Sequence, residues 1–241
     1  MISADQPTCF PRNVRVAVSS REDGTMLDRT RNSRHHPEIV AHRQDFCRTA
    51  GLDYSRCVYQ IISYEADSSF ATIIDVAAPT ADGVQADVVY TETPGVGLFL
   101  PIADCIGTVL YDQTRAALAL AHLGRHASVA KTMSKTIEHF VQKGSNPADL
   151  LIWMSPSIAK EQYGLAYFDD ATATDWEQFV MRKEGKIHLD LAGFNKALAV
   201  HAGVPDANIF VSPVTTATDP NYFSHSQGDS NARFAVVAQL L

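Results

Sequence analysis

The sequence has few of the features that mark nucleic-acid-binding or membrane proteins. Its 20 Lys and Arg residues are outnumbered by 27 Asp and Glu residues, which gives a net charge of −7. A general nucleic-acid binder needs a basic face, and an anionic membrane surface attracts basic segments. No apolar run in the sequence approaches the roughly 20 residues that span a bilayer. We therefore expect neither nucleic acid nor a membrane as a partner.

Cysteine is scarce, and its spacing gives no disulfide framework. The chain contains four cysteines, without a C-x-x-C pair. The first residues lack the basic and apolar segments of a secretory signal, so we expect a reduced, cytoplasmic setting. The sequence also contains no G-x-G-x-x-G motif after a strand and no Walker motif. Neither a dinucleotide-binding fold nor a P-loop fold is therefore supported.

Apolar segments separated by turns dominate the rest of the chain, which is 46% hydrophobic. Helices are predicted from Pro37 to Gly51, from an N-cap at Ser128 to Gly144, and after an N-cap at Asp190. Strands outnumber helices, which favours the α/β class with a mixed sheet and flanking helices. Without linkers or repeats, one domain over residues 1–241 is predicted. The predicted strands are 14–19, 57–63, 71–76, 88–90, 97–102, 108–111, 116–121, 150–154, 209–212 and 233–240.

A thiol and an imidazole stand at corresponding ends of two successive apolar segments. Cys105 closes the segment that begins at Gly97, and His122 closes the segment that begins at Ala116. A strand–turn–strand path can bring two such ends together. The pair suits either a soft metal site or a thiolate activated by a base. A buried structural cysteine is the alternative, since free cysteine is among the most buried residue types.

Several motifs, in order along nearly the whole chain, resemble those of one family. I-A-D-C at 102–105 resembles the family motif T-A-D-C, and A-H-L-G at 121–124 resembles A-H-x-G. Near the end of the chain, F-S-H at 223–225 resembles F-S-x-R-R, and R-F at 233–234 resembles G-R-F. This is the laccase-domain family of multicopper-polyphenol-oxidase-like proteins, which are related to purine-nucleoside-processing enzymes. Further matching segments are 19–21, 40–43, 110–112 and 151–158.

The resemblance implies a fold, an activity and a cofactor. The fold is a single α/β domain with a mixed β-sandwich core and flanking helices, shared with cysteine hydrolases of the toxin-deamidase type. In the family, a Cys and two His bind zinc for phosphorolysis or hydrolytic deamination of a purine nucleoside. Three protein ligands leave one position on zinc for water or phosphate. Copper oxidation is not expected, because no blue-copper ligand set is evident.

The chain departs from the family at the implied zinc ligands. Cys105 and His122 match two of them, but Ile62 stands in place of the third and cannot bind a metal. Tyr64 lies on the same strand face, and Glu65 could reach the site only if the strand bends. His126 could supply a replacement ligand, which would give the set Cys105, His122 and His126. The loss of one ligand predicts weak or absent zinc.

The same resemblance singles out residues for binding an anion. Arg43 and Arg233 are the candidates for phosphate, because a guanidinium presents fork-shaped donors. Arg43 is also a candidate catalytic residue with Cys105 and His122, and His225 falls in a motif at the rim of the family's site. Where the family has G-W-R-G after the second His, this chain has G-R-H-A at 124–127.

Three functions remain open at this point. The first is a zinc-dependent phosphorylase (a transferase) or deaminase (a hydrolase) acting on purine nucleosides. The second is a metal-free hydrolase or deamidase in which Cys105 is the nucleophile and His122 the base. The third is a diverged paralogue without catalysis that keeps a nucleoside pocket or a partner surface.

Overall fold

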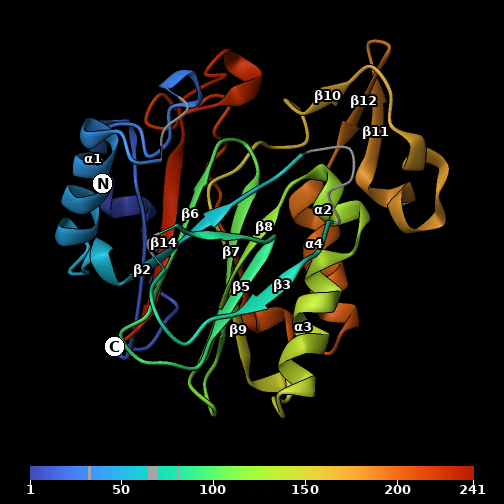
Figure 1. The fold of residues 1–241 in the computed structure, drawn as a ribbon. Coiled ribbons are helices and arrows are strands. Elements are labelled where there is room, and N and C mark those ends of the chain that lie inside the picture. The colour runs from blue at the N-terminus through green and yellow to red at the C-terminus, as the bar shows by residue number, and fades with distance from the viewer. Residues whose placement is uncertain (32–33, 65–69, 81) are drawn as a thin grey trace.

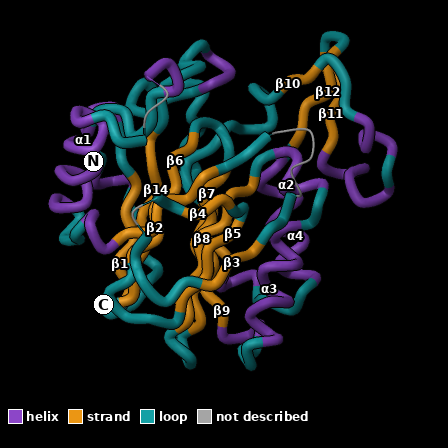
Figure 2. Tube along the Cα trace, viewed as in Figure 1, coloured by secondary structure: helices purple, strands orange, loops and turns teal. Residues whose placement is uncertain are grey.

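Two β-sheets pack face to face with helices outside them, as Figure 1 and Figure 2 show. The structure is a computed structural model that describes residues 1–31, 34–64, 70–80 and 82–241. One sheet has the order β1-β14-β6-β2-β4 and the other β13-β9-β7-β8-β5-β3. The strands of the first are β1 (Val14–Val18), β14 (Phe234–Leu240), β6 (Gly97–Ile102), β2 (Cys57–Ile61) and β4 (Val84–Gln85). Those of the second are β13 (Ile209–Val211), β9 (Leu150–Met154), β7 (Ile106–Asp112), β8 (Ala117–Leu123), β5 (Val88–Thr91) and β3 (Ile73–Asp75).

Both sheets contain parallel and antiparallel pairs, so the predicted mixed α/β architecture is confirmed. The central strands of both sheets are buried on two faces: one face packs against the opposite sheet, and helices cover the other. In β6, Leu98 and Leu100 face the opposite sheet, and Phe99 faces the outer layer. This explains why the central strands are almost continuously apolar instead of alternating with polar residues.

The helices divide between the two outer faces (Figure 1). Helix α1 (Pro37–Thr49) covers the five-stranded sheet, and its Phe46 ring lies 6.3 Å from that of Phe99. Helices α3 (Thr132–Gln142) and α4 (Leu191–His201) cover the six-stranded sheet. The predicted start of α1 at Pro37 and the N-cap at Asp190 are confirmed; an Asp190 oxygen accepts from the Gly193 amide at 2.7 Å.

The predicted N-cap at Ser128 is wrong. Ser128 lies inside the short helix α2 (Arg125–Val129), and α3 begins after Lys131, whose φ is 57°. The Ser128 hydroxyl instead donates to the Gly124 carbonyl at 2.9 Å and accepts from the Asn195 amide at 2.8 Å. A partner on α4 thus fixes a side chain that local sequence would assign to a cap.

A small three-stranded sheet stands beside one end of the sandwich (Figure 1) and was not predicted from the sequence. It consists of β10 (Gly164–Leu165), β12 (Lys186–Leu189) and β11 (Val180–Lys183). The acidic segment between β10 and β11 forms the 3-10 helices Asp169–Thr172 and Thr174–Phe179. Within the described ranges, no helix has both the length and the apolar character needed to cross a bilayer.

Candidate active site

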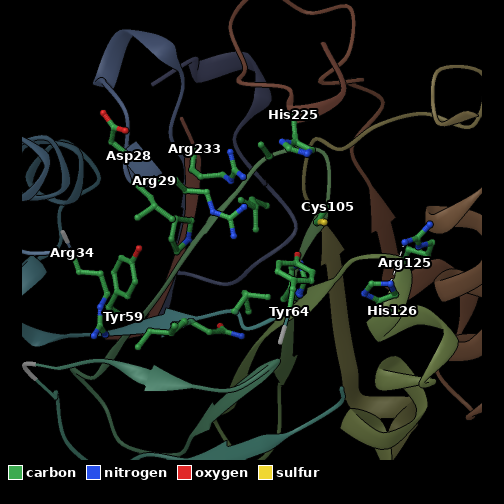
Figure 3. A pocket seen from close by; sticks show the side chains of 18 of the residues that line it. Asp28, Arg29, Arg34, Tyr59, Tyr64, Cys105, Arg125, His126, His225 and Arg233 are labelled. Carbon is green, nitrogen blue, oxygen red and sulfur yellow. Dashed lines mark hydrogen bonds between the residues drawn. The ribbon is translucent and has the colours of Figure 1, made fainter. Parts of the chain in front are cut away.

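A cavity of about 830 Å³ opens at one end of the sandwich. This volume falls in the range of roughly 300–1,000 Å³ that is usual for small-molecule sites. The cavity takes residues from the segment before α1, from β2 and β6, from the β8–α2 junction and from the loop before β14. Cys105, Tyr64 and His225 point into it in Figure 3. His122 and Arg233 also line it.

The hairpin of β7 and β8 places Cys105 beside His122. Cys105 directly precedes β7, and Ile106 pairs with Leu123 at the open end of that hairpin. Both side chains pack on Gly124, where a Cβ atom would lie 2.9 Å from the Cys105 Sγ and 3.2 Å from the His122 Nε2. Gly124 therefore leaves the space in which the thiol and the imidazole meet.

The thiol and the imidazole stabilise each other's charged forms. Burial would raise the pKa of Cys105, but the charge of His122 and hydrogen bonds from His122 and Tyr64 outweigh it, so this pKa is lowered. Burial would lower the pKa of His122, but the Cys105 thiolate and Asp87 raise it to about 9. Both shifts favour the thiolate–imidazolium form of the pair, which is the reactive form of a cysteine.

Asp87 stands behind the imidazole and was missed in the sequence. Its Oδ1 lies 3.5 Å from the His122 Nδ1, and its backbone carbonyl accepts from the His122 amide at 2.8 Å. Its Oδ2 accepts from the Ala71 amide at 2.8 Å, and its carbonyl accepts from the Gln60 side chain at 2.7 Å. The only signal in the sequence is an acidic residue directly before the apolar strand β5, a position that many solvated turn residues share.

The Tyr64 hydroxyl is the third polar group at this centre. It lies 3.3 Å from the His122 Nε2, and the two rings meet edge to face with centroids 6.1 Å apart. Burial and the neighbouring Cys105 raise the pKa of Tyr64, so the phenol stays protonated and can donate a hydrogen bond. Glu65, the other candidate on this segment, lies outside the described residues.

The residues as placed do not fit a three-ligand zinc site. Ile62 lines the cavity at the position of the third family ligand. The His126 ring packs on Phe70 with centroids 4.8 Å apart, and its Nε2 accepts from Arg125 at 3.1 Å. Among the residues with described coordinates, no three His, Cys, Asp or Glu side chains are grouped to hold a metal. The set Cys105, His122 and His126 could bind zinc only if the His126 ring left its contacts with Phe70 and Arg125.

Arginine side chains supply positive charge around the cavity. Arg29 and Arg233 converge on one side of Cys105 in Figure 3, and burial together with the charge of Arg29 lowers the pKa of Arg233. The Arg233 Nη1 donates to the carbonyls of the loop just before it, and His225 stands at the rim above Cys105. Among the described residues, the arginines that line the cavity are Arg29, Arg34, Arg125 and Arg233.

Arg43, the other predicted anion ligand, is not among the residues that line the cavity. It is 1% exposed, and its guanidinium lies 4.5 Å from the centre of the Tyr59 ring. Its Nε donates to the Met26 carbonyl and its Nη1 to the Arg34 carbonyl, each at 2.7 Å. Arg43 thus ties helix α1 to the segment that carries Arg29 and Arg34.

Asp104 anchors the turn that presents Cys105. Its φ is 69°, and its buried carboxylate accepts from the hydroxyls of Thr216 and Ser224, both at 2.7 Å. The Ser226 amide donates to the second carboxylate oxygen at 2.7 Å. The loop that carries His225 is therefore fixed to the residue next to the thiol.

Comparisons with known proteins agree with this architecture. The model of the family described as multi-copper polyphenol oxidoreductase laccase matches residues 15–240. A purine nucleoside phosphorylase of Deinococcus radiodurans is 33% identical over 64% of this chain and 61% of its own length. Adenosine deaminase RL5, from an unknown prokaryotic organism, is 29% identical over 58% of this chain and 55% of its own length. The crystal structure of YlmD from Geobacillus stearothermophilus superposes with a TM-score of 0.80 at 18% identity, covering 97% of this chain and 94% of that one.

Proposed function

Because the chain belongs to the multi-copper polyphenol oxidoreductase laccase family, we propose that it cleaves purine nucleosides with inorganic phosphate in the cavity of Cys105 and His122. The observation that carries the proposal is the position of Arg29 and Arg233 beside the thiol–imidazole pair in one cavity. Two converging guanidinium groups suit the geometry and charge of phosphate. The name of the Deinococcus radiodurans relative supports the same activity.

The reaction needs an anion held in place and a proton for the leaving base. A phosphate oxygen held by Arg29 and Arg233 attacks C1′ of the ribose. The bond between C1′ and the purine nitrogen breaks, and its electron pair passes into the purine ring. His122, whose pKa of about 9 keeps it protonated at neutral pH, donates a proton to the purine as it leaves. Asp87 holds the imidazole from behind.

The assay follows release of the base from inosine, guanosine and adenosine, with and without phosphate. We expect phosphate-dependent release that falls at least a hundredfold in His122→Ala, because a positioned acid contributes about 10²–10⁴ in rate. Arg12→Gln, at an exposed position outside the cavity, is the control. Base release that does not depend on phosphate, or no release at all, would contradict the proposal. Inosine formed from adenosine would point to deamination, the activity in the name of RL5.

The thiolate–imidazolium pair favours one second candidate, a metal-free thiol hydrolase or deamidase. In that reaction the Cys105 thiolate attacks a carbonyl and His122 protonates the leaving amine. Alkylation of Cys105 by iodoacetamide at pH 6, followed by mass spectrometry, tests the candidate. A rate no higher than that of free cysteine would remove it. A protein with neither activity would be the non-catalytic paralogue.

A further inference from the structure

Among the described residues that line the cavity, arginines outnumber carboxylates. Four of its lining residues are arginines, whereas Asp28 is the only carboxylate among the described residues that line it. The protein as a whole carries a net charge of −7. Positive charge gathered in a cleft of an acidic protein draws in anionic ligands and repels cationic ones.

The positive charge lies on two sides of the thiol. In Figure 3, Arg29 and Arg233 lie on one side of Cys105 and Tyr64, and Arg125 lies on the other side with His126. Arg34 stands apart beside Tyr59 and donates to the Asp82 carbonyl. Arg125 is therefore a second centre of positive charge in the cavity, on the side of Cys105 away from Arg29 and Arg233.

Arg125 has no counter-charge in the described structure. Its Nη2 donates to the His126 Nε2 at 3.1 Å, and the ion pairs formed among the described residues do not include it. Its side chain is only partly exposed. An imidazole that accepts at Nε2 adds no negative charge beside the guanidinium. A guanidinium held at a cavity wall by a neutral partner keeps its remaining N–H donors for a ligand.

We infer that the substrate is a purine nucleoside that carries its own phosphate group, and that Arg125 binds this group across the thiol from Arg29 and Arg233. The inference rests on the proposed function and names the substrate class for it. An oxygen of inorganic phosphate bonds to C1′, the bond from C1′ to the purine nitrogen breaks, and the base leaves with the proton from His122. The products are the free base and a ribose phosphorylated at C1′ that retains its original phosphate.

The test compares inosine with inosine 5′-monophosphate, with inorganic phosphate as the second substrate. We expect kcat/KM for the monophosphate to exceed that for inosine by at least tenfold. Arg125→Gln should reduce this preference by about tenfold to a hundredfold, chiefly through KM, because a charge-assisted hydrogen bond is lost. Arg125→Lys keeps the positive charge but loses the bidentate hydrogen bonds of the guanidinium, so it should retain part of the preference for the monophosphate. Arg12→Gln removes the same charge outside the cavity and should leave the preference unchanged.

Calorimetric binding without inorganic phosphate separates this inference from the proposed function. Tighter binding of the monophosphate that depends on Arg125, but without cleavage of either substrate, would support the inference and contradict the proposed function. Cleavage of inosine with no preference for the monophosphate would support the proposed function and contradict the inference. An equal loss for both substrates in Arg125→Gln, with the variant folded by circular dichroism, would also overturn the inference.

Discussion

The His122 imidazole lies between a carboxylate and a thiol, with its Nδ1 3.5 Å from the Asp87 Oδ1 and its other side toward Cys105. This order resembles that of hydrolytic triads, in which an acid orients a histidine that faces a nucleophile. Asp87 is itself fixed by backbone donors, so it can hold the ring in one orientation.

Replacing Asp87 should release the imidazole. In Asp87→Asn, we expect the pKa of His122 to fall, because one of the interactions that raise it is lost. Base release should fall at least tenfold. The pKa is measured by NMR titration of the His122 ring. A pKa that stays near that of the wild type would mean that Cys105 alone sustains the imidazolium.

The activity should have an upper pH limit set by His122. Its pKa rises from an ordinary value of 6.5 to about 9, so its charged form stabilises the fold fully below pH 6.5. This contribution to the free energy of unfolding is lost as pH rises through about 9. Both kcat/KM and the midpoint of urea unfolding should fall across this window, and the fall in midpoint should shrink in His122→Ala. An unchanged pH profile in that variant would assign the loss to another group.

Gly124→Ala should separate the thiol from the imidazole. Its φ of −86° is open to alanine, but the added Cβ would come within 2.9 Å of the Cys105 Sγ and 3.1 Å of the His122 ring. We expect the pKa of Cys105, followed by thiolate absorbance in a pH titration, to rise and base release to fall at least tenfold, because the ion pair is disrupted. Wild-type absorbance in a folded variant would show that the pair does not depend on this space.

Replacing Arg43 tests whether this residue stabilises the fold or binds the phosphate. Its buried guanidinium donates to the carbonyls of Met26 and Arg34, so Arg43→Met should lower the free energy of unfolding by about 2–4 kcal/mol. Chemical denaturation measures this loss. A variant of unchanged stability with a higher KM for phosphate would instead support direct contact between Arg43 and the anion.

The zinc content of the purified protein tests the prediction that the chain lacks one of the three zinc ligands. We expect the purified protein to contain far less than one zinc per chain, with no change in Cys105→Ala, because Ile62 replaces one family ligand. Inductively coupled plasma mass spectrometry measures the zinc content of the wild type and of Cys105→Ala. One zinc per chain that disappears in Cys105→Ala would show that the site is completed by another residue, with His126 as the first to examine.

The parts of the fold that could be predicted are those fixed by local pattern. The apolar runs at 97–102 and 150–154 form β6 and β9, since burial on both faces leaves little choice of residue type. The meeting of Cys105 and His122 followed from a hairpin, a local pairing. The parts that could not be predicted depend on distant partners. Asp87 reaches His122 only because β5 pairs with β8, and Ser128 is held by Asn195 on α4.

The arginines show the same limit in a second way. Arg43 and Arg233 carry the same chemical group. Only the tertiary structure shows that Arg43 packs on the Tyr59 ring, whereas Arg233 lines the cavity. Arg29 and Arg125 sit in segments where an arginine is ordinarily solvated. Their place at one cavity becomes visible only when the two segments meet in the folded structure.

The position of β14 has a consequence for biosynthesis. Strand β14 lies between β1 and β6 and pairs with both. Strand β1 is synthesised early, but it cannot pair until β14 has been synthesised. While the ribosome is still translating, Val14–Val18 has no edge to join, and Asp104 lacks the Ser224 and Ser226 groups that hold its turn. Such long-range pairing slows folding. The nascent protein should therefore remain inactive and in need of protection from aggregation until β14 has emerged.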